Sequence, residues 1–220
     1  MITMKNVIAI SALGFLFLLQ SCSKDVLKGD GTIRTETRAL TSFTSVDISG
    51  NRNVEIIKSD TKKVEVTGFD NLIGSYESKV DNGTLTFGFV NHWRVKNDNI
   101  SLKIYTPDFS EIRLSGNNTV TIGAGFNLND FEASMSGNGK LYFSDGTVNN
   151  LTIKSSGNGE THASNLVSQY VRVEISGNGT AEVNAVKTLS VRISGNGEVH
   201  YWGNPEVNSS ISGNGKTIKH

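Results

Sequence analysis

The sequence predicts an all-β fold, a single-domain parallel β-helix (a solenoid) with coils of about 20 residues and an irregular β N-terminal part. The first observation is a turn, Ser-Gly-Asn-Gly, that recurs along the chain. The serines of its strict and looser copies are successively 66, 21, 20, 20, 18 and 18 residues apart. The second is composition: 23 glycines, only 2 prolines and many β-branched residues favour strands and tight turns.

The third observation is the alternation of apolar and polar residues on both sides of each turn. The residue directly before the serine is apolar in six of the seven copies, as at Ile175 and Ile193. The pattern resumes after the turn, for example at Leu141 and Phe143. A period of two is typical of a half-buried strand. Each repeat therefore predicts a strand, a corner, a second strand and a loop, and stacked repeats would bury one continuous apolar edge.

The turn itself is expected to form the corner of each coil. Glycine adopts positive φ without steric cost, and asparagine tolerates the left-handed region better than most residues. Asparagine side chains at equivalent corners can also form a hydrogen-bonded ladder along the stack. A calcium-binding turn would need about half this period and a recurring Asp, and no acidic residue recurs at the corner. The residues with this structural role are Gly137, Asn138, Gly139, Gly157, Asn158, Gly159, Gly177, Asn178, Gly179, Gly195, Asn196, Gly197, Gly213, Asn214 and Gly215.

The β-helical domain is expected to span residues 39–220, with irregular first coils or a cap over 39–110 and regular coils over 111–220. In the irregular part we expect strands at 43–57, 64–67, 85–90 and 100–105. A loose copy of the turn at Ser49 indicates an early coil. The 66-residue gap after it holds an insertion or a separate β layer, and either would cap the exposed edge of the stack.

Residues 1–21 have the features of a signal peptide. Lys5 provides a positive charge, and 7–19 is an apolar run too short for a membrane span but typical of a signal-peptide core. The segment LQSC, which ends at Cys22, resembles the lipobox of bacterial lipoproteins and implies cleavage before a lipidated Cys22. The alternative is an ordinary secretory signal followed by a chance cysteine. We expect 22–38 to hold the lipidated cysteine and a tether.

The remaining composition limits the partners. Cys22 is the only cysteine, which excludes intramolecular disulfides and a Cys-based zinc site. Without Lys5 the chain carries 20 basic and 21 acidic residues. Such a balance gives no electrostatic reason to expect nucleic acid or an anionic membrane surface as a partner. The expected membrane contact is therefore made through the lipid on Cys22.

Three segments carry a resemblance to a known family: FTSVDISGNRNVEI, LIGSYESKVDNGTLTF and ISLKIYTPDFSEIRLSGNNTVTI, followed by the serial corners. They resemble the putative auto-transporter adhesin head GIN domain family over about residues 39–218. The resemblance implies a β-helical fold and a secreted or lipid-anchored protein of the Gram-negative cell envelope. It brings no catalytic residues.

The repeat register predicts which outward side chains stack in neighbouring coils. Six residues past the serine lie Tyr142, His162, Glu182 and His200. Two imidazoles and a carboxylate, about one coil apart, could bind zinc or a similar divalent metal through His162, Glu182 and His200. The alternative interpretation is a column of solvated polar pairs, each worth about 0.2–1 kcal/mol.

Two further sets of outward residues are notable. The aromatic residues Trp93, Tyr142 and Trp202 could stack against sugar rings, and with the column above they are the candidate ligand-binding residues. A second column, with alternating charge, suits simple pairing between coils and consists of Lys154, Glu174 and Arg192. No cofactor is implied.

Enzyme signatures are missing: the sequence has no GxSxG, P-loop, HExxH or dinucleotide-binding motif. We therefore expect a lipid-anchored cell-envelope protein that binds or scaffolds through the outer faces of its β-helix, with a glycan or a protein as ligand. We expect an outer-membrane lipoprotein, with the side of the membrane left open. One alternative is a polysaccharide-acting enzyme, which an acidic cleft between residues 68–110 and the coils would favour. Another is a purely structural envelope protein.

Overall fold

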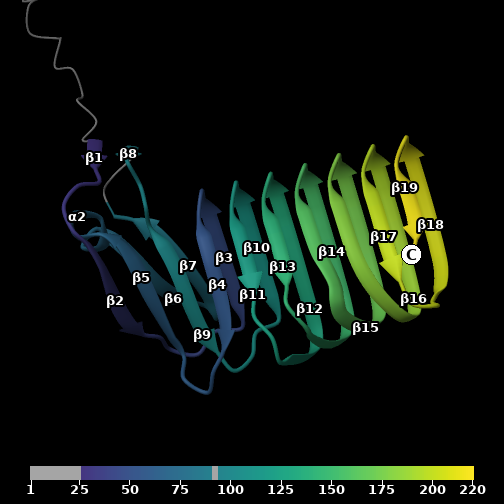
Figure 1. The fold of residues 1–220 in the computed structure, drawn as a ribbon, viewed down its shortest axis with the longest axis horizontal. Coiled ribbons are helices and arrows are strands. Elements are labelled where there is room, and N and C mark those ends of the chain that lie inside the picture. The colour runs from purple at the N-terminus through teal and green to yellow at the C-terminus, as the bar shows by residue number, and fades with distance from the viewer. Residues whose placement is uncertain (1–25, 91–93) are drawn as a thin grey trace, which may run out of the picture.

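The computed structural model describes residues 26–90 and 94–220, and it confirms a parallel β-solenoid (Figure 1). The irregular part contains β1 (Val26–Lys28), β2 (Ile33–Ala39), β3 (Ser45–Gly50), β4 (Asn53–Lys58), β5 (Lys63–Phe69), α2 (Asp70–Ile73), β6 (Tyr76–Asp81), β7 (Thr84–Phe89), β8 (Arg94–Lys96) and β9 (Ser101–Thr106). The regular coils contain β10 (Glu111–Gly116), β11 (Thr119–Ile122), β12 (Phe126–Gly137), β13 (Lys140–Phe143), β14 (Gly146–Gly157), β15 (Glu160–Gly177), β16 (Thr180–Gly195), β17 (Glu198–Trp202), β18 (Glu206–Gly213) and β19 (Lys216–Lys219). Within the described residues, no helix is both long and apolar enough to cross a membrane.

The corners of successive coils lie in register. Ser115 pairs with Ser49 on one side and with Ser136 on the other, so the 66-residue gap in sequence separates adjacent coils in space. The same parallel register continues through Ser156, Ser176, Ser194 and Ser212. The expected single strand over 43–57 is in fact divided by the first corner into β3 and β4.

The glycines of the corner have two separate roles. The first glycine of each strict copy has positive φ, as at Gly177 with +128°. In the last three strict copies the second glycine is required by close packing: a Cβ on Gly197 would lie 2.6 Å from the Ile175 side chain and 2.9 Å from the carbonyl oxygen of Gly179. The expectation that the corner asparagines use the left-handed region is wrong, because the only described non-glycine residues with positive φ are Asn82 and Asn97.

The corner asparagines instead form the expected ladder. The Nδ2 of Asn158 donates to the Oδ1 of Asn138 at 2.9 Å, and Asn178 and Asn196 each repeat this bond at 2.9 Å with the coil before. The ladder reaches Asn51 at one end and Asn214 at the other. Because each interior amide both donates and accepts, the ladder fixes the asparagine at every corner.

The elements inserted between the first and second corners, together with β2, cover the end of the first coil. Strands β7 and β9 continue the stack in parallel beyond β3 and β4. Strands β6, β5 and β2 then add antiparallel, and the short helix α2 buries Leu72 and Ile73. Antiparallel strands and a buried helix end the parallel stack, which would otherwise present an open sheet edge.

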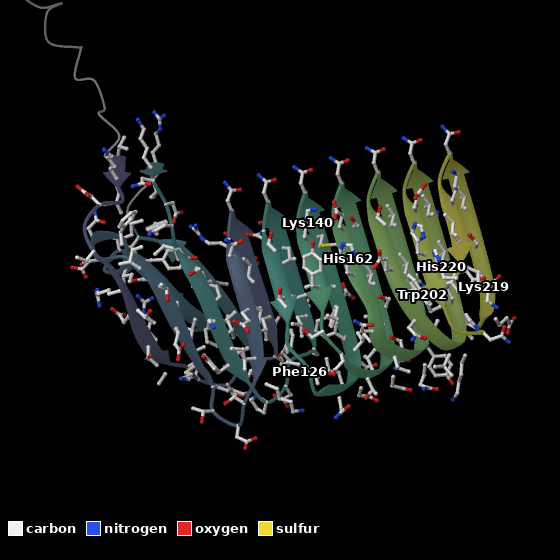
Figure 2. The ribbon with its side chains drawn as sticks, in the orientation of Figure 1. Phe126, Lys140, His162, Trp202, Lys219 and His220 are labelled. Atoms are coloured by element: carbon white, nitrogen blue, oxygen red, sulfur yellow. The ribbon has the colours of Figure 1, made fainter. Side chains whose placement is uncertain are left out.

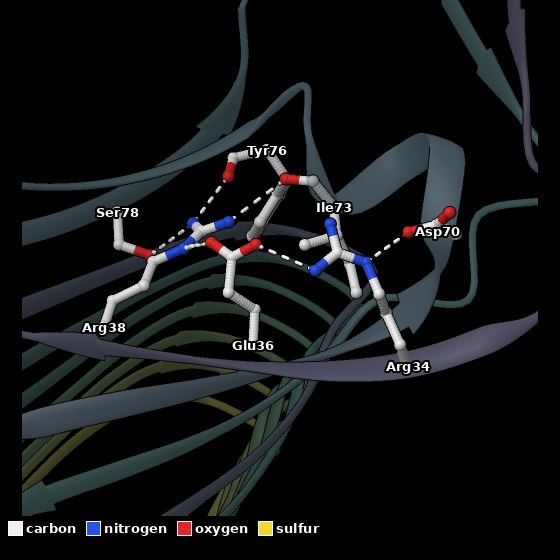
Figure 3. A network of polar contacts seen from close by, with 7 residues as sticks. All are labelled: Arg34, Glu36, Arg38, Asp70, Ile73, Tyr76 and Ser78. Carbon is white, nitrogen blue, oxygen red and sulfur yellow. Dashed lines mark hydrogen bonds and ion pairs between the residues drawn. The ribbon is translucent and has the colours of Figure 1, made fainter.

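The expected tether over 22–38 is wrong from residue 26 onward. Strand β1 pairs with β8, and all seven residues of β2 pair with β5. Figure 3 shows what holds β2: the Arg38 guanidinium donates to the carbonyl oxygens of Tyr76 at 2.6 Å and Ile73 at 3.0 Å. Arg38 also bonds Glu36 at 2.7 Å, and this hydrogen bond lowers the pKa of Glu36. Strand β2 is mostly exposed, so its folding leaves no apolar signal in the sequence.

Candidate functional site

The regular coils present two outer faces. One is the outer surface of the strands that lead into the corners, where the corner serines lie. The other is the outer surface of the strands that leave the corners, which we call the imidazole face and which holds Tyr142, His162, Glu182 and His200. All four sequence-predicted residues of the column lie in register on adjacent strands.

The contacts in this column join neighbours in pairs. The rings of Tyr142 and His162 stack with centroids 4.7 Å apart and planes 4° from parallel. The Nδ1 of His162 lies 3.0 Å from the Oε2 of Glu182, while its Nε2 lies 3.5 Å from the Oε2 of Glu160. Lys140, beside His162 in Figure 2, bonds Glu160 and thereby lowers the pKa of that carboxyl group.

The structure does not bring His162, Glu182 and His200 together as a metal site. The Nδ1 of His200 faces His220 at 2.9 Å rather than Glu182. Over residues 26–90 and 94–220, no group of three or more His, Cys, Asp or Glu side chains is arranged to hold a metal ion. The physical reason is that outward side chains on adjacent strands run parallel to one another, so each meets its neighbours and three do not converge on one point.

The aromatic residues do not form a shared platform either. One face of Tyr142 is covered by His162, and Trp202 stacks on His220 with centroids 4.6 Å apart and planes 15° from parallel (Figure 2). Tyr142 and Trp202 therefore each use a ring face to stack on a histidine of a neighbouring strand, and that face is not available to a sugar. Trp93 and Cys22 lie outside the described residues.

The outer face that leads into the corners holds an open trough of about 600 Å³ that crosses six coils. Corner serines line it, and the intervening residues Met135 and Ile175 contribute to its floor. The corner serines along it are Ser115, Ser136, Ser156, Ser176 and Ser194, and Ser134 and Ser155 also line it. Sequence reasoning missed this trough. The available signal was the serine itself, which recurs in all seven copies although the corner geometry requires only the glycines.

Charged side chains flank the trough. Lys154, Glu174 and Arg192 are adjacent in register, as the sequence predicts. Lys154 and Glu174, however, form their ion pairs with residues outside this column. The Nζ of Lys154 lies 2.7 Å from Glu132, and Glu174 bonds Arg172. These pairs neutralise much of the charge beside the trough.

A smaller hollow of about 370 Å³ on the same face contains Glu111, Asp130 and Glu132. A glycosidase acid needs a raised pKa. Here the hydrogen bond from Lys154 lowers the pKa of Glu132. Asp130 accepts a hydrogen bond from Asn150 at 2.6 Å. The hollow lies on the regular coils. It is therefore not an acidic cleft between residues 68–110 and the coils, which is the feature that would favour an enzyme.

Comparison with known proteins gives a family and a fold. Residues 42–205 match the family described as "Putative auto-transporter adhesin, head GIN domain". Among curated proteins no significant match was found.

Several solved structures share the fold. A putative adhesin from Bacteroides fragilis NCTC 9343 is 22% identical, with a TM-score of 0.71 over 88% of this chain and 99% of that one. A protein named a putative lipid binding protein, from Parabacteroides distasonis ATCC 8503, is 21% identical with a TM-score of 0.62 over 89% and 100%. A putative adhesin from Parabacteroides merdae ATCC 43184 is 18% identical with a TM-score of 0.55 over 89% and 99%. At these identities the likeness shows the fold alone.

Proposed function

Because this chain belongs to the family of putative auto-transporter adhesin head GIN domains, we propose that it is a cell-envelope binding protein that holds an extended, uncharged glycan along its serine-lined trough. We further propose that a lipid on Cys22 anchors it to the outer membrane. The family supports an adhesin-like role in the cell envelope. The anchor rests on the LQSC segment before the folded part.

The observation that carries the proposal is the trough itself. It crosses six coils, and parallel strands about 4.8 Å apart make that about 24 Å from end to end. Each serine hydroxyl can donate one hydrogen bond and accept two. A row of identical hydroxyls at a fixed spacing suits a polymer with repeating hydroxyl groups. The ion pairs beside the trough favour an uncharged chain over an acidic one.

Binding is tested by filling the trough. Ser156 is exposed at the middle of the row, so Ser156→Trp should block an extended ligand without disturbing the core. We expect the wild-type protein to be retarded in affinity electrophoresis by a neutral polysaccharide from a panel of mannan, arabinogalactan and dextran, with heparin as the acidic comparison. Ser156→Trp should bind about tenfold more weakly, a difference of about 1.4 kcal/mol.

The matched control is Thr121→Trp, which places the same side chain on the imidazole face next to Tyr142. It should bind like the wild type. Equal loss in both variants, or tight binding to heparin alone, would contradict the proposed site. If no polysaccharide is bound, the structural role becomes the better explanation.

The anchor is tested separately. Cys22→Ser removes the proposed lipid acceptor, and we expect the protein to move from the membrane fraction to the soluble fraction when cells are fractionated. Ser23→Ala is the control and should remain with the membrane. Continued membrane association of Cys22→Ser would overturn the anchor and leave the trough proposal unaffected.

A further inference from the structure

Two imidazoles meet on the imidazole face near the C-terminal end of the stack. His200 belongs to β17, and His220 directly follows β19, which pairs in parallel with β17. The Nδ1 of His200 lies 2.9 Å from the Nε2 of His220. His220 is exposed and 23% of the His200 side chain is exposed, so solvent reaches the pair.

The distance between these two nitrogens is suitable for both of them to bind the same metal ion. Imidazole nitrogens bind divalent transition metals at about 2.0–2.1 Å. Two such nitrogens at right angles on one ion lie about 2.9 Å apart, the hypotenuse of a right triangle whose two arms are the metal–nitrogen bonds. His220 lies two residues beyond Ile218, the register partner of His200 on the neighbouring strand, and the rotamers of the two side chains bring their nitrogens to the spacing of two neighbouring ligand positions of a tetragonal ion.

Other groups orient both rings for this role. The Nε2 of His200 lies 3.4 Å from the Oε2 of Glu198. A carboxylate at that nitrogen favours the proton there and leaves the lone pair of Nδ1 facing His220. Metal-ligating histidines commonly donate their other N–H to a carboxylate in this way. Trp202 stacks on the His220 ring at 4.6 Å and restrains it (Figure 2).

We propose that Nδ1 of His200 and Nε2 of His220 form a two-imidazole site for a divalent transition-metal ion, with Cu²⁺ preferred and water in the remaining positions. The preference for Cu²⁺ follows from the stability order of first-row ions and from the tetragonal geometry that it favours. In the metal-free protein the hydrogen between the rings would sit on His220 Nε2. Binding moves it to Nδ1 of the same ring. The site is separate from the trough, and it does not depend on the proposed function.

Trp202 provides the readout, because a paramagnetic ion held by the ring on which it stacks should quench its fluorescence. The chain has two tryptophans, so Trp93→Phe makes Trp202 the only emitter. In this background we expect CuCl₂ to quench fluorescence in a saturable manner. His220→Ala and His200→Ala should each weaken the response by more than tenfold, because even outer-shell partners of a metal are worth about 10–100-fold in affinity.

Two variants make the test specific. His162→Ala removes an imidazole that contacts Tyr142 and Glu182, and it should leave quenching unchanged. Glu198→Gln should weaken binding without abolishing it, as expected for a positioning residue. Unchanged quenching in His220→Ala, or equal loss in His162→Ala, would overturn the site. His220 follows the last residue of β19, so its replacement should not affect folding, and an unchanged circular dichroism spectrum checks this.

Discussion

Replacing Gly177 with valine is expected to destabilise the solenoid by about 4 kcal/mol or more, a loss at the upper end for single substitutions. Gly177 has a φ of +128°, which a β-branched residue resists. A Cβ there would also lie 2.5 Å from the carbonyl oxygen of Gly157 in the adjacent coil. Because that oxygen belongs to the backbone, neither strand can yield without breaking register. The measurement is the urea concentration at the midpoint of unfolding, which reports a change in stability when the slope of the free energy against urea concentration is unchanged.

Valine substitutions at two other glycines separate the cost of backbone strain from the cost of steric overlap with the adjacent coil. Gly50 also has positive φ, +89°, but no atom lies within 4 Å of its Cβ position. Gly50→Val should therefore cost only the backbone strain, about 2 kcal/mol. Gly88 has open space and no positive φ, so Gly88→Val should be nearly neutral. If Gly177→Val unfolded at the same urea concentration as Gly88→Val, the account of the corner would be wrong.

The first corner departs from the motif because it contacts the cap. Arg52 stands where the strict copies of the turn have their second glycine, and only 9% of its side chain is exposed. Its guanidinium lies 2.5 Å from the Oδ2 of Asp98 and donates to the Tyr76 hydroxyl at 3.1 Å. It also lies 5.1 Å from the centre of the Tyr76 ring. The arginine thus joins the first coil to β6 and to the segment before β9.

Arg52→Met should cost about 3–5 kcal/mol, because removing one partner of a buried ion pair leaves the other without compensation. The double variant Arg52→Met with Asp98→Asn should recover part of this loss, since it removes the unpaired carboxylate. Lys103→Met is the control, because it breaks an exposed ion pair with Glu55. The Lys103 side chain is 54% exposed and that of Glu55 is 46% exposed. Such a pair contributes little. Equal shifts of the urea midpoint for Arg52→Met and Lys103→Met would contradict a buried role for Arg52.

The coils could be predicted from sequence because their determinants are local and repeated. Alternating apolar residues specify the strands, and the glycines specify a corner that recurs in register. Strand β2, IRTETRA, could not be recognised in the same way. It is polar, and the contacts that hold it are a backbone ladder to β5 and the bonds of Arg38 to residues far along the chain.

The candidate site could be predicted only in part. The register placed Tyr142, His162, Glu182 and His200 side by side, because all lie six residues past a corner serine. Which atoms meet depends on side-chain rotamers, and these turn His200 toward His220. The trough depends on the small volume of serine across many coils, a property of the stack rather than of any one repeat. Ser155 is among the residues that line the trough, and its buried Oγ has no hydrogen-bond partner among the described residues.

The most direct test of the central claim is a lysine footprint of the bound protein. Lys154 lines the trough and Lys140 lies on the imidazole face, and their side chains are 45% and 44% exposed. Each pairs with a glutamate, at 2.7 Å and 2.9 Å. Acetylation with and without the retarding polysaccharide, read by mass spectrometry, should show Lys154 protected and Lys140 labelled as before. Protection of Lys140 with full labelling of Lys154 would contradict binding in the trough and place the ligand on the imidazole face.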